Sequence, residues 1–324
     1  MKVFAAVILC VALHADQVIY AQHSNHSVSL SNKKMKNLQV YYRTVKIGGL
    51  DIFYREAGNK EKPSILLLHG FPASSHMYRD LINDLAGSFH VIAPDYPGFG
   101  ASEAPSRKTF TYSFDNLTAI IEQFIDRIGL TKFSLYLQDY GGPVGFKIAS
   151  RRPSSIQALI LQNANAYLEG IGPAFSAVPE FWKNRNAETE KPVRAQLTLE
   201  GTKFQYLDGV ADATTINPDA YVYDQYLLDR TDNNEIQMDL FYDYRHNVPL
   251  YPVWQEYLKQ YQPPTLITWG MNDKFFTAQG AKAYLQHLPN AELHLLNSGH
   301  FALEEFHTEI AGFIKSFFER KGLR

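Results

Sequence analysis

Three residues with reactive side chains follow short apolar segments of the chain, in the order Asp139, Asp273 and His300. A carboxylate that stands exposed at the end of a strand can attack a carbon atom. A histidine that is oriented by a second carboxylate can take a proton from water. The residue types and their order therefore suggest a nucleophile, an acid and a base drawn from distant parts of the chain.

The segment LQDYGGPVG places Asp139 where a buried strand turns sharply into a helix. Gly141 and Gly142 permit the tight turn and the close packing of the helix, and serine is the usual occupant of the exposed position in such a turn. Taken alone, Asp139 could equally be only the N-cap of the next helix, which is a common role for aspartate.

The other two residues favour the chemical interpretation. Asp273 follows a strand and a glycine in WGMND, and His300 directly follows the last strand in LLNSGH. A single histidine at a strand end is more often structural than catalytic. The order nucleophile, acid, histidine, each at its own strand end, is much harder to obtain by chance. We therefore predict that Asp139, Asp273 and His300 form a catalytic triad.

The elements that must position these residues alternate between two types. Apolar segments typical of buried strands occur at 64–70, 90–94, 133–138, 156–164, 265–270 and 291–296. Segments with helical spacing of apolar residues follow at 113–129, 141–153 and 308–320. Strands that are apolar throughout and alternate with helices predict an α/β fold, with a mostly parallel sheet covered on both faces.

One internal stretch breaks this alternation. Residues 165–253 are polar, aromatic and mostly helical in character, as in YVYDQYLLDR and EIQMDLFYDYRHNV. We predict a core domain formed by residues 40–164 and 254–324, with a helical cap at 165–253 inserted over one end of the sheet.

The N-terminus is typical of an exported protein. Lys2 precedes an apolar stretch that ends near Ala15, and a small residue follows at Ala21. This pattern predicts a signal peptide at 1–21, a linker at 22–39 and a secreted or periplasmic location, because the stretch is too short to span a membrane. Removal of the signal peptide would also remove Cys10, the single cysteine, which would exclude disulfides and thiol chemistry.

Composition narrows the classes of partner. Hydrophobic residues make up 45% of the 324 residues and charged residues 20%, with a formal net charge of -2. Such a balance is ordinary for a globular enzyme and gives no electrostatic attraction to nucleic acid. No metal-ligand spacing, dinucleotide motif or phosphate-binding loop is present, so we expect no cofactor and no metal. The sequence leaves the oligomeric state open.

From about residue 40 to its end the chain resembles the α/β-hydrolase superfamily, and within it the branch of epoxide hydrolases and haloalkane dehalogenases. The motifs that carry the resemblance are HGFP (69–72), PDYPGFGAS (94–102), QDYGG (138–142), GMND (270–273) and SGHF (298–301). The resemblance implies an alkyl-ester intermediate on Asp139, hydrolysed by water that His300 and Asp273 activate. It also implies an oxyanion hole formed by the backbone N–H groups of Phe71 and Tyr140.

The leaving group separates the two activities of this branch. Epoxide hydrolases use two cap tyrosines as acids, and the candidates here are Tyr206, Tyr221, Tyr223, Tyr226, Tyr242 and Tyr244. Haloalkane dehalogenases typically use a tryptophan after the nucleophile and a second tryptophan or asparagine. Tyr140 and Phe71 occupy the corresponding positions, although the Tyr140 hydroxyl and Trp182 in the cap could still donate.

We therefore expect an epoxide hydrolase that acts on a small apolar organic substrate and water. Trp182, Tyr206, Tyr226 and Tyr244 are its predicted substrate-binding residues. The first alternative is a haloalkane dehalogenase with the same triad. A non-catalytic small-molecule receptor is a further alternative, although such a protein would not need the complete triad.

Overall fold

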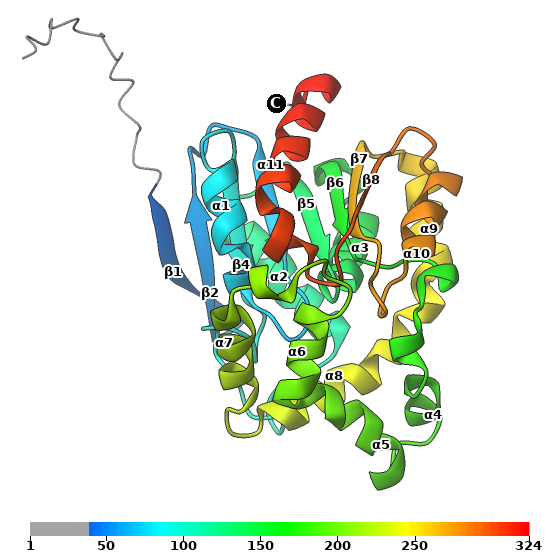
Figure 1. Ribbon diagram of the computed structural model, residues 1–324. Coiled ribbons are helices and arrows are strands. Elements are labelled where there is room, and N and C mark those ends of the chain that lie inside the picture. Colours follow the sequence, from blue (N-terminus) through cyan, green and yellow to red (C-terminus); the bar gives the residue numbers. More distant parts are fainter. Residues whose placement is uncertain (1–38, 324) are drawn as a thin grey trace, which may run out of the picture. The chain divides into compact units, whose positions relative to one another are not determined.

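The computed structural model describes residues 39–323 (Figure 1). The predicted signal peptide at 1–21, with Cys10, lies outside the described residues, as does the predicted linker up to residue 38. Within the described part, no helix is long and apolar enough to cross a membrane.

The described residues form an eight-stranded sheet in the order β1-β2-β4-β3-β5-β6-β7-β8. Strands β1, β2 and β4 pair antiparallel, and all other neighbours pair parallel. The prediction of a mostly parallel sheet is therefore confirmed. The strands are β1 (Val40–Ile47), β2 (Leu50–Ala57), β3 (Ser64–Leu68), β4 (His90–Pro94), β5 (Phe133–Gln138), β6 (Ile156–Gln162), β7 (Thr265–Gly270) and β8 (Glu292–Leu296).

Strand β3 shows how both faces of the sheet are covered. All of its side chains are buried, and they alternate between two hydrophobic clusters, with Leu66 and Leu68 in one and Ile65 and Leu67 in the other. The first cluster includes buried residues of α2 (Phe114–Arg127), α3 (Gly141–Arg151) and α10 (Ala278–Ala283). The second includes those of α1 (Arg79–Leu85) and α11 (Ala302–Lys321), which Figure 1 shows side by side.

The helix predicted after the second parallel strand is confirmed as α2. Its N-cap is Ser113, whose hydroxyl accepts a hydrogen bond from the backbone N–H of Asn116 at 3.2 Å. The chain leaves the helix at Gly129, where φ is +73°. Glycine adopts this left-handed conformation without the steric strain that a side chain would add.

The last helix begins six residues earlier than predicted. Helix α11 starts at Ala302, directly after the loop that carries His300, and its backbone is non-helical at Phe306. The apolar periodicity that predicts the helix starts only after this break. The first turn is therefore invisible to the pattern, although it is the part that lies beside His300.

The segment between β6 and β7 is helical, and we refer to residues 165–253 as the cap. Figure 1 shows these helices gathered beside one end of the sheet, except the last of them, which lies next to α10 along the sheet. They are α4 (Val178–Lys183), α5 (Ala187–Arg194), α6 (Leu199–Leu207), α7 (Pro218–Leu228), α8 (Asn233–Asp243) and α9 (Tyr251–Tyr261). Helix α9 crosses the predicted boundary at 253 and packs on α3, where the rings of Trp254 and Phe146 stack with centroids 5.4 Å apart.

Candidate active site

Asp139 occupies the sharp turn between β5 and α3, with φ at +47°. Neighbouring glycines make room for this strained turn. A Cβ atom on Gly70 would lie 2.2 Å from the Cβ of Asp139, and a Cβ on Gly141 would lie 2.0 Å from the carbonyl oxygen of Leu68. The strand, the following helix and the 69–72 loop can therefore approach closely only because these positions lack side chains.

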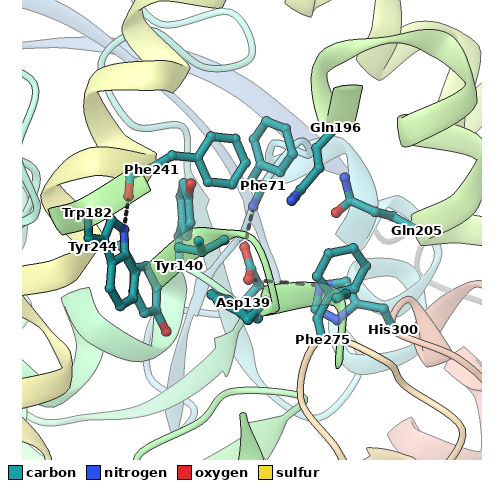
Figure 2. Close-up of a pocket in the computed structure, with 13 residues that line it drawn as sticks. Phe71, Asp139, Tyr140, Trp182, Gln196, Gln205, Phe241, Tyr244, Phe275 and His300 are labelled. Atoms are coloured by element: carbon teal, nitrogen blue, oxygen red, sulfur yellow. Dashed lines mark hydrogen bonds and ion pairs between the residues drawn. The ribbon is translucent and has the colours of Figure 1, made fainter. Parts of the chain in front are cut away.

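The carboxylate of Asp139 is held from two sides (Figure 2). The backbone N–H of Phe71 donates a hydrogen bond to Oδ1 at 2.6 Å, and Oδ2 lies 3.9 Å from Nε2 of His300. Burial raises the pKa of Asp139, while His300 and the backbone N–H groups of Phe71 and Tyr140 act to lower it. The carboxylate is thus enclosed by protein but has charge-stabilising partners.

His300 lies between two carboxylates. Its Nδ1 is 2.8 Å from Oδ2 of Asp273, which fixes the orientation of the ring and leaves Nε2 facing Asp139. Burial lowers the pKa of His300, but the charge and hydrogen bond of Asp273, together with the charge of Asp139, outweigh burial and raise it overall. This is the environment expected of a general base that must become cationic during the reaction.

Asp273 is itself oriented by two donors. Its Oδ1 accepts a hydrogen bond from the backbone N–H of Phe275 at 2.7 Å, and its Oδ2 accepts one from Nδ2 of Asn163 at 2.8 Å. The Asn163 side chain also accepts a hydrogen bond from the backbone N–H of Gly270 at 2.9 Å. The Asn163 amide cannot serve as the acid of the triad, but its hydrogen bonds fix the position of Asp273 and of the end of β7.

Gln138 also contacts His300, and the sequence motifs do not predict this contact. Its Nε2 lies 3.2 Å from Nε2 of His300, and the side chain is fully buried. The available signal was a polar residue at the end of an otherwise largely apolar strand, directly before Asp139.

A cavity opens in front of Asp139 and His300. Most of its wall is aromatic, and the carboxamides of Gln196 and Gln205 interrupt it (Figure 2). Besides Asp139 and His300 its lining consists of Phe71, Tyr140, Ala174, Phe175, Val178, Trp182, Gln196, Gln205, Phe241, Tyr244 and Phe275. Within the described residues, no group of three or more histidine, cysteine or acidic side chains is arranged to hold a metal ion.

The four predicted cap residues divide into two pairs. Trp182 and Tyr244 line the cavity, whereas Tyr206 and Tyr226 do not, in contrast to the prediction. The Tyr206 hydroxyl donates to Asp224 at 2.5 Å, and its ring stacks on Phe301 away from the cavity. Tyr226 points to solvent and is 69% exposed.

Trp182 and Tyr244, the two predicted residues that line the cavity, differ in whether their N–H or O–H donor is free to bind a substrate. The indole N–H of Trp182 donates to the carbonyl of Phe241 at 2.8 Å and is therefore already occupied. The Tyr244 hydroxyl is buried and makes no well-formed hydrogen bond within the described residues, although the Tyr251 hydroxyl interacts with it. Burial raises the pKa of Tyr244 well above its ordinary value, so the phenol stays protonated near neutral pH.

The fold and this arrangement agree with the comparisons to known proteins. The model of the α/β hydrolase fold family matches residues 63–306. The chain is an α/β hydrolase. Its sequence relatives also place it in the branch of that superfamily that contains haloalkane dehalogenases and epoxide hydrolases.

Three relatives illustrate the range of the similarity. An uncharacterized hydrolase of Saccharomyces cerevisiae is 40% identical to this α/β hydrolase over 292 residues, which covers 88% of this chain and 99% of the relative. Haloalkane dehalogenase 2 of Mycobacterium tuberculosis is 42% identical over 101 residues, covering 31% of this chain and 35% of the relative. Epoxide hydrolase 4 of Mus musculus is 36% identical over 122 residues, covering 38% and 34%.

These similarities show that this α/β hydrolase is an enzyme of the hydrolase class. The carboxylate of Asp139, an oriented histidine and a backbone N–H donor meet at its cavity. Such a constellation can form an ester on the carboxylate and then hydrolyse it.

Proposed function

We propose that the enzyme hydrolyses small alkylating substrates through an ester on Asp139. We further propose that these substrates are epoxides. The observation that carries the proposal is the Asp139 carboxylate at the strand-to-helix turn, with Oδ1 on the Phe71 N–H and Oδ2 facing His300. A carboxylate in this position is suited to displacement at an sp³ carbon. Attack on an ester carbonyl would give an anhydride instead.

The first step forms a bond between Oδ2 of Asp139 and a ring carbon of the epoxide, and the carbon–oxygen bond of the ring breaks. The leaving oxygen then carries the electron pair and requires a proton. The buried hydroxyl of Tyr244 at the cavity is the acid that we assign to this step.

The second step regenerates the enzyme. His300 takes a proton from water at Nε2, and the hydroxide attacks Cγ of Asp139. Negative charge develops on Oδ1, where the backbone N–H groups of Phe71 and Tyr140 stabilise it. Collapse of this intermediate breaks the bond between Cγ and the alkyl oxygen, which takes the proton from His300 and leaves as part of the diol. The proton that remains on the Asp139 carboxyl group returns to the Tyr244 phenolate, which restores the carboxylate and the phenol.

Halide displacement is the second candidate, and the stretch of similarity to a haloalkane dehalogenase favours it. The same triad would serve. The Trp182 indole N–H is engaged with a carbonyl, however, and the residue after the nucleophile is Tyr140 instead of a tryptophan. Halide binding would therefore need other neutral donors, such as the buried Tyr140 hydroxyl, so we rank it after epoxide opening.

The decisive experiment is the mass of the intact His300→Gln variant after exposure to 1,2-epoxybutane and, separately, to 1-bromobutane. Loss of the base blocks the second step, so the ester accumulates on Asp139. We expect an adduct of the epoxide mass, which Asp139→Asn abolishes. An adduct from the bromoalkane alone would reverse the ranking, and no adduct from either would favour the non-catalytic receptor.

The role of Tyr244 is tested by Tyr244→Phe. Because general-acid catalysis contributes about 10²–10⁴-fold, we expect epoxide opening to slow by at least about 10²-fold while alkylation by bromobutane is little changed. Tyr226→Phe is the matched control, since Tyr226 is an exposed cap tyrosine outside the cavity. Equal effects of the two substitutions in single-turnover assays would remove Tyr244 from the mechanism.

We also propose that the protein is exported, on the basis of residues 1–21 alone. Expression of the full chain followed by N-terminal sequencing of the secreted or periplasmic fraction tests this. A mature protein beginning near Gln22 supports export, whereas a retained Met1 contradicts it.

A further inference from the structure

The two ends of the cavity differ in chemistry. Trp182, Tyr244 and Phe241 line one end with aromatic rings, whereas the carboxamides of Gln196 and Gln205 lie at the other end, beside Phe275. Figure 2 shows both carboxamides directed into the cavity on the side of His300, away from Trp182 and Tyr244. Gln196 belongs to the short helical turn Ala195–Leu197 and Gln205 to α6, so both come from the cap.

The side-chain N–H₂ group of Gln205 is a buried hydrogen-bond donor without an acceptor in the described part of the protein. The side chain is 2% exposed, and its Nε2 has no hydrogen-bond partner within the described residues. Such a group has lost its hydrogen bonds to water without replacing them, which is unfavourable for folding. A bound molecule with an acceptor at this place would satisfy it.

Helix α6 is held in the orientation that points Gln205 at the cavity. The hydroxyl of Thr202 donates to Gln225 at 2.8 Å, and the hydroxyl of Tyr206 donates to Asp224 at 2.5 Å. Both partners lie on α7, so two buried hydrogen bonds fix the rotation of α6 against its neighbour. The carboxamide is therefore presented by a rigid support.

The chemistry of the carboxamide limits what it can recognise. It does not titrate, so it cannot protonate a leaving oxygen, and it carries no charge to attract an ion. It offers an N–H donor and a carbonyl acceptor side by side. This pair is complementary to a hydroxyl, carbonyl or amide group on a substrate.

We propose that Gln205, assisted by Gln196, forms a polar subsite that selects substrates with a hydroxyl or carbonyl substituent beside the reacting carbon. The inference rests on the proposed function and narrows its substrate class from apolar epoxides to functionalised ones. In the productive pose the substituent occupies the glutamine end and the reacting carbon faces Oδ2 of Asp139.

The test compares two substrates that differ in one group. Glycidol and 1,2-epoxybutane have the same skeleton, with a hydroxyl in one where the other has a methyl. We expect Gln205→Met, which keeps the length of the side chain, to lower kcat/KM for glycidol about tenfold and to leave that for 1,2-epoxybutane unchanged or higher. Gln196→Met should act in the same direction with a smaller effect, because Gln196 is only half-buried.

Two kinetic outcomes would overturn the proposal. An equal loss for both epoxides would mean that Gln205 acts on the oxirane or on the attacking water. No change for either would mean that the carboxamide contributes nothing to recognition. If the enzyme displaces halides instead, the same comparison of kcat/KM is made with two bromides, 2-bromoethanol and 1-bromopropane, which also differ by a hydroxyl in place of a methyl group.

A binding measurement separates the subsite from the proposed reaction. Glycerol and 1,2-butanediol are the diols that the two epoxides would give, and their binding to the protein can be compared by saturation-transfer NMR without turnover. A preference for glycerol that is lost in Gln205→Met supports the subsite even if no epoxide is opened. The same preference in both proteins contradicts it, whatever the reaction is.

Discussion

At the residue scale, His300 is the side chain on which the two proposed steps depend most. Its raised pKa results from carboxylates on either side, with Asp273 contributing more than Asp139, against the opposing effect of burial. The charge of Asp139 disappears when the ester forms. His300 should therefore lose part of its tendency to hold a proton at the moment when it must act as a base.

These opposing effects predict how the pKa of His300 should differ between the wild type and two variants. We expect His300 to titrate above its ordinary value of about 6.5 in the wild type, at a lower pH in Asp139→Asn and at a lower pH still in Asp273→Asn. Imidazole signals followed by NMR across the pH range measure all three. Hydrolysis of the ester should correspondingly fail as the pH drops below the pKa, because the imidazolium cannot accept a proton. A larger effect of Asp139→Asn than of Asp273→Asn would contradict the order.

Much of the triad could be predicted from the sequence because each member follows its own strand, and the order along the chain is itself informative. The supporting residues were harder to predict. Asn163 contacts the acid that follows the neighbouring strand β7, and Gln138 contacts the histidine that follows β8, which is not a neighbour of β5 in the sheet; a linear pattern shows neither contact. Six cap tyrosines had equal claims, and only the packing of the cap distinguishes Tyr244 from Tyr206 and Tyr226.

At the scale of elements, the junction of β5 and α3 depends on small residues. A Cβ on Gly141 would lie 2.0 Å from the backbone oxygen of Leu68, while a Cβ on Gly142 would lie 3.3 Å from the side chain of Ala164. The first contact is against rigid backbone and the second against a side-chain methyl group. The two positions should therefore respond differently to the same substitution.

We expect Gly141→Ala to destabilise the protein by about 1–3 kcal/mol, because the helix must move away from β3. Gly142→Ala should cost clearly less. Gly312→Ala in the exposed face of α11 is the control and should stabilise by about 0.5–1 kcal/mol, since nothing lies near its Cβ. Urea unfolding midpoints measure the series. Equal losses at Gly141 and Gly142 would show that the cause is not the contact with Leu68.

The inner strands β3 to β7 were predicted well because they are buried on both faces and so carry continuous apolar segments. Helix α1 was not predicted, since its seven residues give too short a pattern. The cap helices α7 and α8 were recognised as helical, but their apolar residues are spread around the helix. Their buried faces, and hence the cavity lining, could not be assigned from periodicity alone.

At the scale of the whole molecule, the cap and the core meet beside the active site through Tyr206. Its ring stacks on Phe301, the residue after His300, with centroids 4.0 Å apart. Its hydroxyl donates to Asp224, a fully buried carboxyl group on α7. Burial raises the pKa of Asp224 to about 8, with the nearby Glu304 adding to the shift and the Tyr206 hydrogen bond opposing it. This junction therefore contains an acid that is protonated at neutral pH.

The sign of the resulting pH dependence follows from proton linkage. Between the ordinary aspartate pKa of about 4 and the native value of about 8, the folded protein keeps a proton that the unfolded chain has released. Asp224 therefore makes the folded state progressively less stable as the pH rises through this window, by at most about 1.4 kcal/mol per pH unit. Above the native pKa the loss is complete and changes no further.

Asp224→Asn should remove this dependence, because the amide resembles the protonated carboxyl group and still accepts the hydrogen bond from Tyr206. We expect the variant to match the wild type at or below about pH 4 and to exceed it in free energy of unfolding by a margin that grows towards pH 8. Asp219→Asn, at an exposed position on the same helix, is the control and should show no such growing margin. Denaturant titrations at three pH values measure the difference. A margin that stays constant or shrinks with pH would mean that Asp224 is ionised in the folded protein, and that Tyr206 donates its hydrogen bond to a charged carboxylate.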